Sequence, residues 1–155
     1  MKVLIFTMLV GAGHNEVAKN IAEQLKNDGN EVLVHELFSG HKGYTGSIHG
    51  GFTLMSKLPK VANYFYNRSK KTGKGIFSKW TQKCGDEILP IVNEFEPDVI
   101  ISTHIAGRFF VKQYQNEFKK PVKNYFVVTD YEITPGLKGF ADNDYVIVPN
   151  DDFIE

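Results

Sequence analysis

The sequence has one cysteine, Cys84, in 155 residues, so an internal disulfide is impossible. A disulfide-stapled secreted domain is therefore excluded, and the reducing cytoplasm is the expected compartment. No apolar run approaches the ~20 residues that a membrane-spanning helix needs. Eighteen basic residues balance eighteen acidic ones, so the overall charge gives no reason to expect a nucleic-acid partner.

Two common nucleotide-binding motifs are missing from the amino terminus. A dinucleotide fingerprint needs a third glycine where Glu16 stands, and that carboxylate would face the pyrophosphate. A P-loop needs Gly-Lys-Ser/Thr after its glycines, and these residues are not present. The apolar start also resembles a short secretory signal, but the amphipathic helix that follows at once favours a folded strand–helix unit. An NAD or ATP site is therefore not expected here.

What the amino terminus does contain is a buried strand, a tight turn and a helix. The strand ends in Gly11-Ala12-Gly13, and His14 opens the helix, with Gly29 at its expected left-handed end. The helix has its apolar residues at Val17, Ala18, Ile21, Ala22 and Leu25. Such a turn lets another molecule approach the backbone, and the helix amino terminus favours negative charge. The turn also carries a histidine, which allows chemistry as well as binding.

The rest of the chain alternates between strands and helices. We predict strands at Glu31–Leu37, Asp98–Thr103, Val122–Thr129 and Tyr145–Val148, and helices at Thr53–Arg68, Ile76–Phe95 and Gly107–Phe118. Fully apolar strands that alternate with helices indicate a parallel sheet covered on both faces. The expected fold class is thus α/β, a Rossmann-like, doubly wound parallel sheet in one domain. Its strand order is predicted to be of the three-two-one-four-five type, with the 38–97 connection crossing the first strand.

This topology brings three distant polar segments together. Gly11–His14 ends the first strand, Thr103-His104 ends the third and Thr129-Asp130 ends the fourth. Ligands of open parallel sheets bind beyond the carboxyl ends of the strands, where the strand order reverses. We therefore expect these segments to form one site at that edge.

No acidic residue occurs between Glu36 and Asp86, although this window holds half of the basic residues together with eight aromatic ones. Basic and aromatic side chains in mixture suit an anionic membrane surface, and also single-stranded nucleic acid or a plain solvated face. We favour the membrane. The basic residues expected to contact it are Lys57, Lys60, Arg68, Lys70, Lys71 and Lys74.

Three segments resemble one family in order and spacing. They are Gly11-Ala12-Gly13-His14, Pro97-Asp98-Val-Ile-Ile-Ser-Thr-His104 and Val128-Thr129-Asp130-Tyr131. The chain is similar along essentially its whole length to the amino-terminal domain of diacylglycerol glycosyltransferases. These are the monogalactosyldiacylglycerol synthases and the bacterial processive glucosyltransferases.

The resemblance implies a two-domain glycosyltransferase of the GT-B fold. The half represented by residues 1–155 would bind the membrane and the diacylglycerol acceptor, and a carboxy-terminal half, expected to be absent here or separate, would bind a UDP-sugar. His14 matches the proposed base of this inverting reaction, and the positive helix end keeps its imidazole neutral. Asp130 would orient His14 or bind the acceptor. The remaining substrate-binding candidates are Gly11, Ala12, Gly13, Thr103, His104 and Thr129.

The resemblance implies no cofactor and no metal, with the UDP-sugar acting as a substrate. The expected location is cytoplasmic, at the inner face of the cell membrane, and the isolated chain is expected to be inactive. A second interpretation stays open: a non-catalytic α/β module that binds membrane or a small ligand at the same edge. In that case His14, His104 and Asp130 are only capping, packing and turn residues.

Overall fold

The computed structural model describes residues 1–9, 13–39, 57–61, 63, 64, 67, 88–129 and 143–151. Their order is β1 (Lys2–Thr7), α1 (Gly13–Asn27), β2 (Glu31–Glu36), β3 (Val99–Ser102), α5 (Gly107–Phe118), β4 (Lys123–Val127) and β5 (Tyr145–Ile147). Residues 88–95 are also helical. The strands form one five-stranded sheet in which every neighbouring pair is parallel. The predicted Rossmann-like α/β class is confirmed.

The strand order is β2-β1-β3-β4-β5. As predicted, the connection after β2 carries the chain across β1, so that β3 pairs with the other side of β1. The three-two-one-four-five label is wrong, because that order needs a further strand outside β2. Within the described part of the chain, β2 is the edge strand. The reversal of order between β1 and β3 is the feature that creates a binding edge in such sheets.

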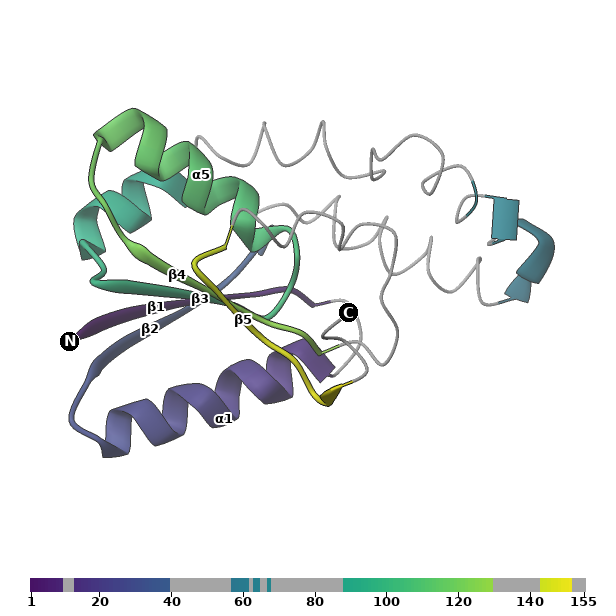
Figure 1. The fold of residues 1–155 in the computed structure, drawn as a ribbon, viewed down its shortest axis with the longest axis horizontal. Helices are drawn as coiled ribbons and strands as arrows, with labels where there is room; N and C mark the ends of the chain where they lie inside the picture. The colour runs from purple at the N-terminus through teal and green to yellow at the C-terminus, as the bar shows by residue number, and fades with distance from the viewer. Residues whose placement is uncertain are drawn as a thin grey trace.

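Helices cover both faces of this sheet. Figure 1 shows α1 against one face and α5, together with the helix at 88–95, against the other. Side chains alternate along a strand, and β1 accordingly sends Leu4 and Phe6 toward the α5 side and Val3 and Ile5 toward α1. All four are at most 1% exposed. Each such apolar side chain adds roughly 1.5–3 kcal/mol to folding, so β1 is the centre of the core.

Gly107 sets where α5 starts. A methyl group at its Cα would lie 2.3 Å from Ser102 Oγ and 3.3 Å from Phe6 Cβ. Only glycine allows the helix to begin this close to the end of β3. At the far end of α1, Gly29 has a φ of +80°, which confirms its predicted left-handed position.

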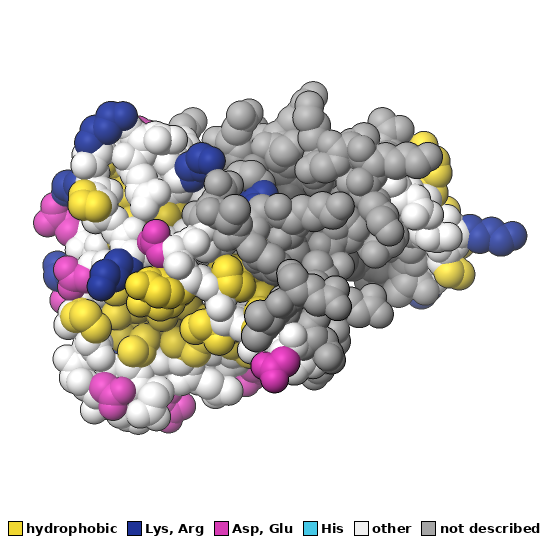
Figure 2. All heavy atoms as spheres, in the orientation of Figure 1, with side chains coloured by type: hydrophobic (Ala, Val, Ile, Leu, Met, Phe, Trp, Pro, Cys, Tyr) yellow, Lys and Arg dark blue, Asp and Glu magenta, His cyan; other side chains and the backbone are white. Residues whose placement is uncertain are grey.

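The sheet face that packs against α1 is covered by this helix at β1 and β3 but is exposed at β5. Val3 and Ile5 of β1 and Val99 and Ile101 of β3 pack under α1. At the other edge, Tyr145 and Ile147 of β5 are 52% and 51% exposed, and Tyr145 stacks on Tyr125 at 4.7 Å between ring centroids. Figure 2 shows apolar side chains gathered in one patch on this side of the molecule.

The described helices include none that is both long and apolar enough to cross a bilayer. Of the helix predicted at 53–68, residues 57–61, 63, 64 and 67 are described; all are exposed, and all except Leu58 are helical. In Figure 1 this short teal segment lies far to the right of the sheet.

Candidate functional site

The site lies at the carboxyl ends of β1, β3 and β4. These strands end at Thr7, Ser102 and Val127, and in Figure 1 both α1 and α5 begin at the same edge. Polar side chains from the ends of the three strands and from the first turn of α1 meet there, as the strand-end pattern predicts. We refer to them as the carboxyl-edge cluster, which consists of Thr7, His14, Asn15, Thr103, His104 and Thr129.

His14 is the centre of this cluster. It is 9% exposed, and its Nδ1 lies 2.8 Å from the main-chain oxygen of Thr103 and 2.5 Å from Oγ1 of Thr129. The Thr129 hydroxyl also donates to the Thr103 oxygen, at 3.3 Å. These partners are 89 and 115 residues away in the sequence, so only the folded sheet brings them together.

The Thr103 contact determines which ring nitrogen of His14 carries the proton. A carbonyl oxygen only accepts hydrogen bonds, so the neutral imidazole must donate from Nδ1. Thr129 fits this arrangement, because its hydroxyl accepts from Nδ1 and donates to the carbonyl. The other nitrogen, Nε2, therefore keeps its lone pair and is the atom that can take up a proton.

A second chain of hydrogen bonds connects Thr103 to Thr7 and Thr7 to Asn15. Thr103 donates to Oγ1 of Thr7 at 3.1 Å, and Thr7 donates to Oδ1 of Asn15 at 2.6 Å. Thr103 and Thr7 are 0% and 4% exposed, which makes these bonds costly to leave unmade. They tie β3 to β1 and to the first turn of α1, next to His14. Sequence reasoning missed Thr7 and Asn15, although Thr7 is the one polar residue in the apolar run from Val3 to Met8.

His104 lies beside His14. The two rings are 4.9 Å apart between centroids and nearly perpendicular, at 85°. Nδ1 of His104 accepts the main-chain N–H of Ala106 at 3.1 Å, just before α5 begins. Burial, and to a smaller extent the neighbouring His14, lower the pKa of His104 from 6.5 to about 3. His104 is therefore neutral at physiological pH.

The structure brings together four of the predicted site residues: His14, Thr103, His104 and Thr129. Gly13 is the first residue of α1, and a Cβ there would meet no atom of the described residues within 4 Å. Gly11, Ala12 and Asp130 lie outside the described residues. Nδ1 of His14 contacts Thr103 and Thr129, and the role expected of Asp130 stays a prediction.

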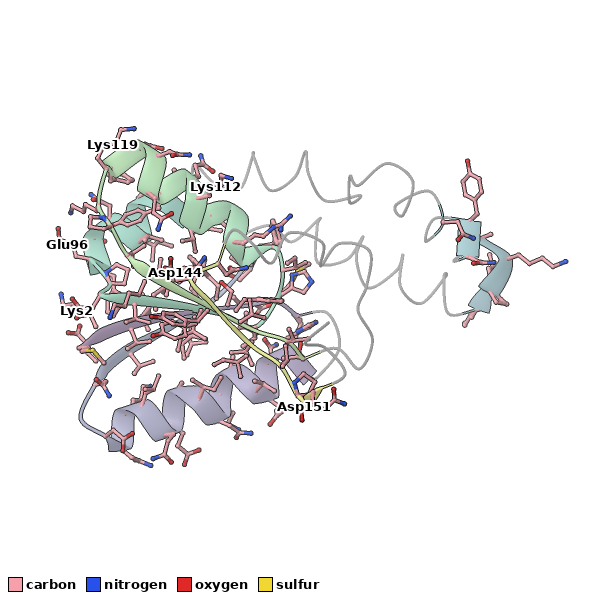
Figure 3. The ribbon with its side chains drawn as sticks, in the orientation of Figure 1. Lys2, Glu96, Lys112, Lys119, Asp144 and Asp151 are labelled. Carbon is pink, nitrogen blue, oxygen red and sulfur yellow. The ribbon has the colours of Figure 1, made fainter. Side chains whose placement is uncertain are left out.

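Of the predicted membrane contacts, Lys57 and Lys60 are described and exposed. Next to them, Leu58, Val61 and Tyr64 are 44%, 38% and 60% exposed. Arg68, Lys70, Lys71 and Lys74 lie outside the described residues. Figure 3 places the labelled Lys2, Glu96 and Lys119 at the opposite edge of the sheet, where α5 ends, so the Lys120–Glu96 ion pair is remote from the carboxyl-edge cluster.

Comparison with known proteins places the chain in a family. The sequence model of monogalactosyldiacylglycerol (MGDG) synthase matches residues 14–155. The chain belongs to this family. The match begins at His14 and includes the other three polar residues that contact it.

One similar curated protein is the processive diacylglycerol beta-glucosyltransferase of Bacillus pumilus (strain SAFR-032). It is 28% identical over 140 residues, which cover 84% of this chain and 34% of that protein. The chain thus spans about a third of the length of this relative. No solved structure matches the chain significantly.

Proposed function

We propose that this chain is the acceptor-binding half of an inverting glycosyltransferase that moves a hexose from a UDP-sugar to diacylglycerol in glycolipid synthesis. The observation that carries the proposal is the state of His14. Its Nδ1 contacts the main-chain oxygen of Thr103, so the neutral ring carries its proton on Nδ1 and leaves Nε2 as an acceptor at the amino terminus of α1. Membership of the MGDG synthase family supports the choice of reaction.

In this proposal His14 Nε2 accepts the proton of the acceptor hydroxyl. The hydroxyl oxygen forms the bond to the anomeric carbon of the sugar, the bond from that carbon to the phosphate oxygen breaks, and UDP leaves. Attack from the face opposite to UDP inverts the anomeric centre. The Thr103 and Thr129 contacts hold the ring in one orientation, so little of its motion must be frozen when the hydroxyl binds.

The other parts of the proposal concern partners. The UDP-sugar site belongs to a separate or further domain of the GT-B type, and no cofactor or metal is assigned to this half. The protein would act as a peripheral protein on the cytoplasmic face of the cell membrane. Lys57 and Lys60 suit anionic head groups, and the exposed Leu58, Val61 and Tyr64 suit the interfacial layer.

The decisive experiment joins this chain to the carboxy-terminal part of the Bacillus pumilus relative and measures hexose transfer to diacylglycerol. His14→Gln keeps a hydrogen-bonding side chain but cannot accept the proton. It should lower turnover by roughly 10²–10⁴-fold. His35→Gln is the matched control, since His35 lies on β2, packs edge-on against Phe6, and should leave turnover unchanged.

An active fusion in which His14→Gln turns over normally would refute His14 as the base. A fusion that folds and binds vesicles but transfers no sugar would favour the non-catalytic module instead.

Membrane binding is tested on the chain alone. Charge reversal at Lys57 and Lys60 should weaken its binding to vesicles that contain anionic lipid, by about 1 kcal/mol or more for each lysine. Wild-type binding should also fall as ionic strength rises. Lys19→Glu with Lys26→Glu, two exposed positions on α1, is a control of equal charge change. Binding that ignores salt, or that falls equally in both variants, would contradict the assigned contact surface.

A further inference from the structure

The two histidines of the carboxyl-edge cluster use the same ring nitrogen in opposite ways. Nδ1 of His14 donates to the Thr103 oxygen, whereas Nδ1 of His104 accepts the N–H of Ala106. A neutral imidazole has one donor and one acceptor nitrogen. His14 therefore has a bare Nε2, and His104 has a protonated one. The pair offers one acceptor and one donor from rings that are in contact.

The donor character of His104 does not change with physiological pH. Its pKa is lowered to about 3, mainly by burial. Among the described residues, His14 from α1 is the titratable group that faces it, and Arg108 is the charged residue in the first turn of α5, the helix that follows His104. The bond from Ala106 also occupies the nitrogen that would otherwise gain the second proton. His104 therefore cannot share the role of base.

The spacing of the rings suits one small ligand group. Centroids 4.9 Å apart permit the two Nε2 atoms to lie within about 6 Å of each other, which is the span that a single oxygen bridges with two hydrogen bonds of about 3 Å. A hydroxyl is the group that matches, because it donates to one nitrogen and accepts from the other. A carbonyl or ether oxygen only accepts, and an ammonium group only donates.

We propose that His104 is a specificity-determining residue whose Nε2–H binds the same hydroxyl oxygen whose proton His14 Nε2 accepts, so that the pair selects an alcohol as its ligand. That this alcohol is the acceptor of the sugar rests on the proposed function. The tautomers of His14 and His104 and the preference for a hydroxyl ligand are independent of the proposed function.

The first test uses the free chain with ¹⁵N-labelled histidine and measures the ring nitrogens by NMR. We expect His14 to show a protonated Nδ1 and a bare Nε2, and His104 to show the reverse. His104 should keep this pattern from pH 8 down to pH 5. The same tautomer in both rings, or protonation of His104 between pH 5 and 7, would overturn the proposal.

The second test compares two probes, 1,2-dihexanoyl-sn-glycerol and the dihexanoyl ester of 1,2-propanediol, which lacks the free hydroxyl. Wild type should bind the first about fivefold to tenfold more tightly, the usual effect of one hydrogen bond. His104→Gln, whose amide N–H replaces Nε2–H, should keep most of this preference. His104→Asn, whose oxygen can still accept from Ala106, should fold normally and show a clearly smaller preference, because only the bond to His14 Nε2 remains.

Equal or undetectable binding of the two probes by wild type would overturn the assignment of a hydroxyl ligand, as would an unchanged preference in a folded His104→Asn protein. Neither test requires sugar transfer. A failure here is therefore distinguishable from a failure of the proposed reaction, which depends on His14→Gln in the active fusion.

Discussion

The two helices that begin at the carboxyl edge show contrasting ways to place a histidine. At the start of α1, His14 is fixed by strand-end residues 89 and 115 positions away. At the start of α5, His104 is fixed by the N–H of Ala106, two positions along the chain. The helix-start glycines differ too, because Gly13 faces open space and Gly107 is pressed against Ser102. The start of α5 is thus tightly packed against β3, whereas at the start of α1 no described atom lies within 4 Å of the place of a Cβ on Gly13.

The largest effect on the free energy of unfolding is expected when the pH is lowered. Because the folded-state pKa of His104 lies below its ordinary 6.5, the unfolded chain binds the proton more tightly. This contribution to stability is fully present above pH 6.5 and is lost as the pH falls toward 3. By pH 4 we expect a loss of about 3 kcal/mol, which urea unfolding at several pH values would measure.

His104→Asn should flatten this pH dependence. His35, whose pKa is also lowered by burial, contributes in the same direction and remains in both proteins, so the difference between them isolates His104. Parallel curves for the two proteins would contradict a buried, neutral His104.

The next largest effect is a difference in stability between alanine substitutions at Gly107 and at Gly13. Gly107→Ala adds a methyl group that would lie 2.3 Å from Ser102 Oγ, so α5 or β3 must shift. We expect a loss of about 2 kcal/mol in the free energy of unfolding, with changed NMR signals for His104. Gly13→Ala, with nothing within 4 Å, should stay within about 0.5 kcal/mol of wild type. Equal losses would show that the two helix starts do not differ as described.

A smaller effect is expected from Thr103→Val. The variant keeps the shape and the main-chain oxygen of residue 103 but removes the bond to Thr7. The free energy of unfolding should fall by about 1 kcal/mol. The tautomer of His14 should not change, and a change in its ring-nitrogen shifts would mean that the hydroxyl, rather than the main chain, orients the base.

The smallest effect is expected from Thr129→Val, at about 0.5 kcal/mol. This variant removes the second partner of His14 Nδ1 and leaves the Thr103 oxygen in place. The ring should keep its tautomer and gain mobility, seen as broader ring signals. Thr129→Ser should restore the wild-type spectrum, since it restores the hydroxyl.

Much of this architecture follows from local patterns in the sequence. The predicted helix at Gly107–Phe118 agrees with α5 at both ends, and the predicted strands at Glu31–Leu37 and Tyr145–Val148 each end one residue later than β2 and β5. Parallel strands have apolar centres and turn residues at their ends, so such runs are easy to recognise. The predicted strand order was wrong in placing a further strand outside β2, because the periodicity of apolar residues does not indicate which strand lies at the edge of the sheet.

The candidate site was predicted in outline and missed in detail. Strand ends locate His14, Thr103, His104 and Thr129, since topology alone brings them to one edge. The sequence cannot show that the partner of His14 is a main-chain oxygen, because every residue has one. Nor can it show the opposite tautomers of the two histidines, which depend on contacts of about 3 Å.

The main-chain oxygen of residue 103 has an evolutionary consequence. Any amino acid at that position supplies the same carbonyl, so the orientation of His14 is inherited through the course of β3 and not through a side chain. A mutational scan of residue 103 would report on packing and on the hydroxyl bond, and would leave this contact unseen. Transplanting the site to another protein would therefore require the strand register of β1 with β3, from Val3 opposite Val99 to Phe6 opposite Ser102, in addition to the histidine itself.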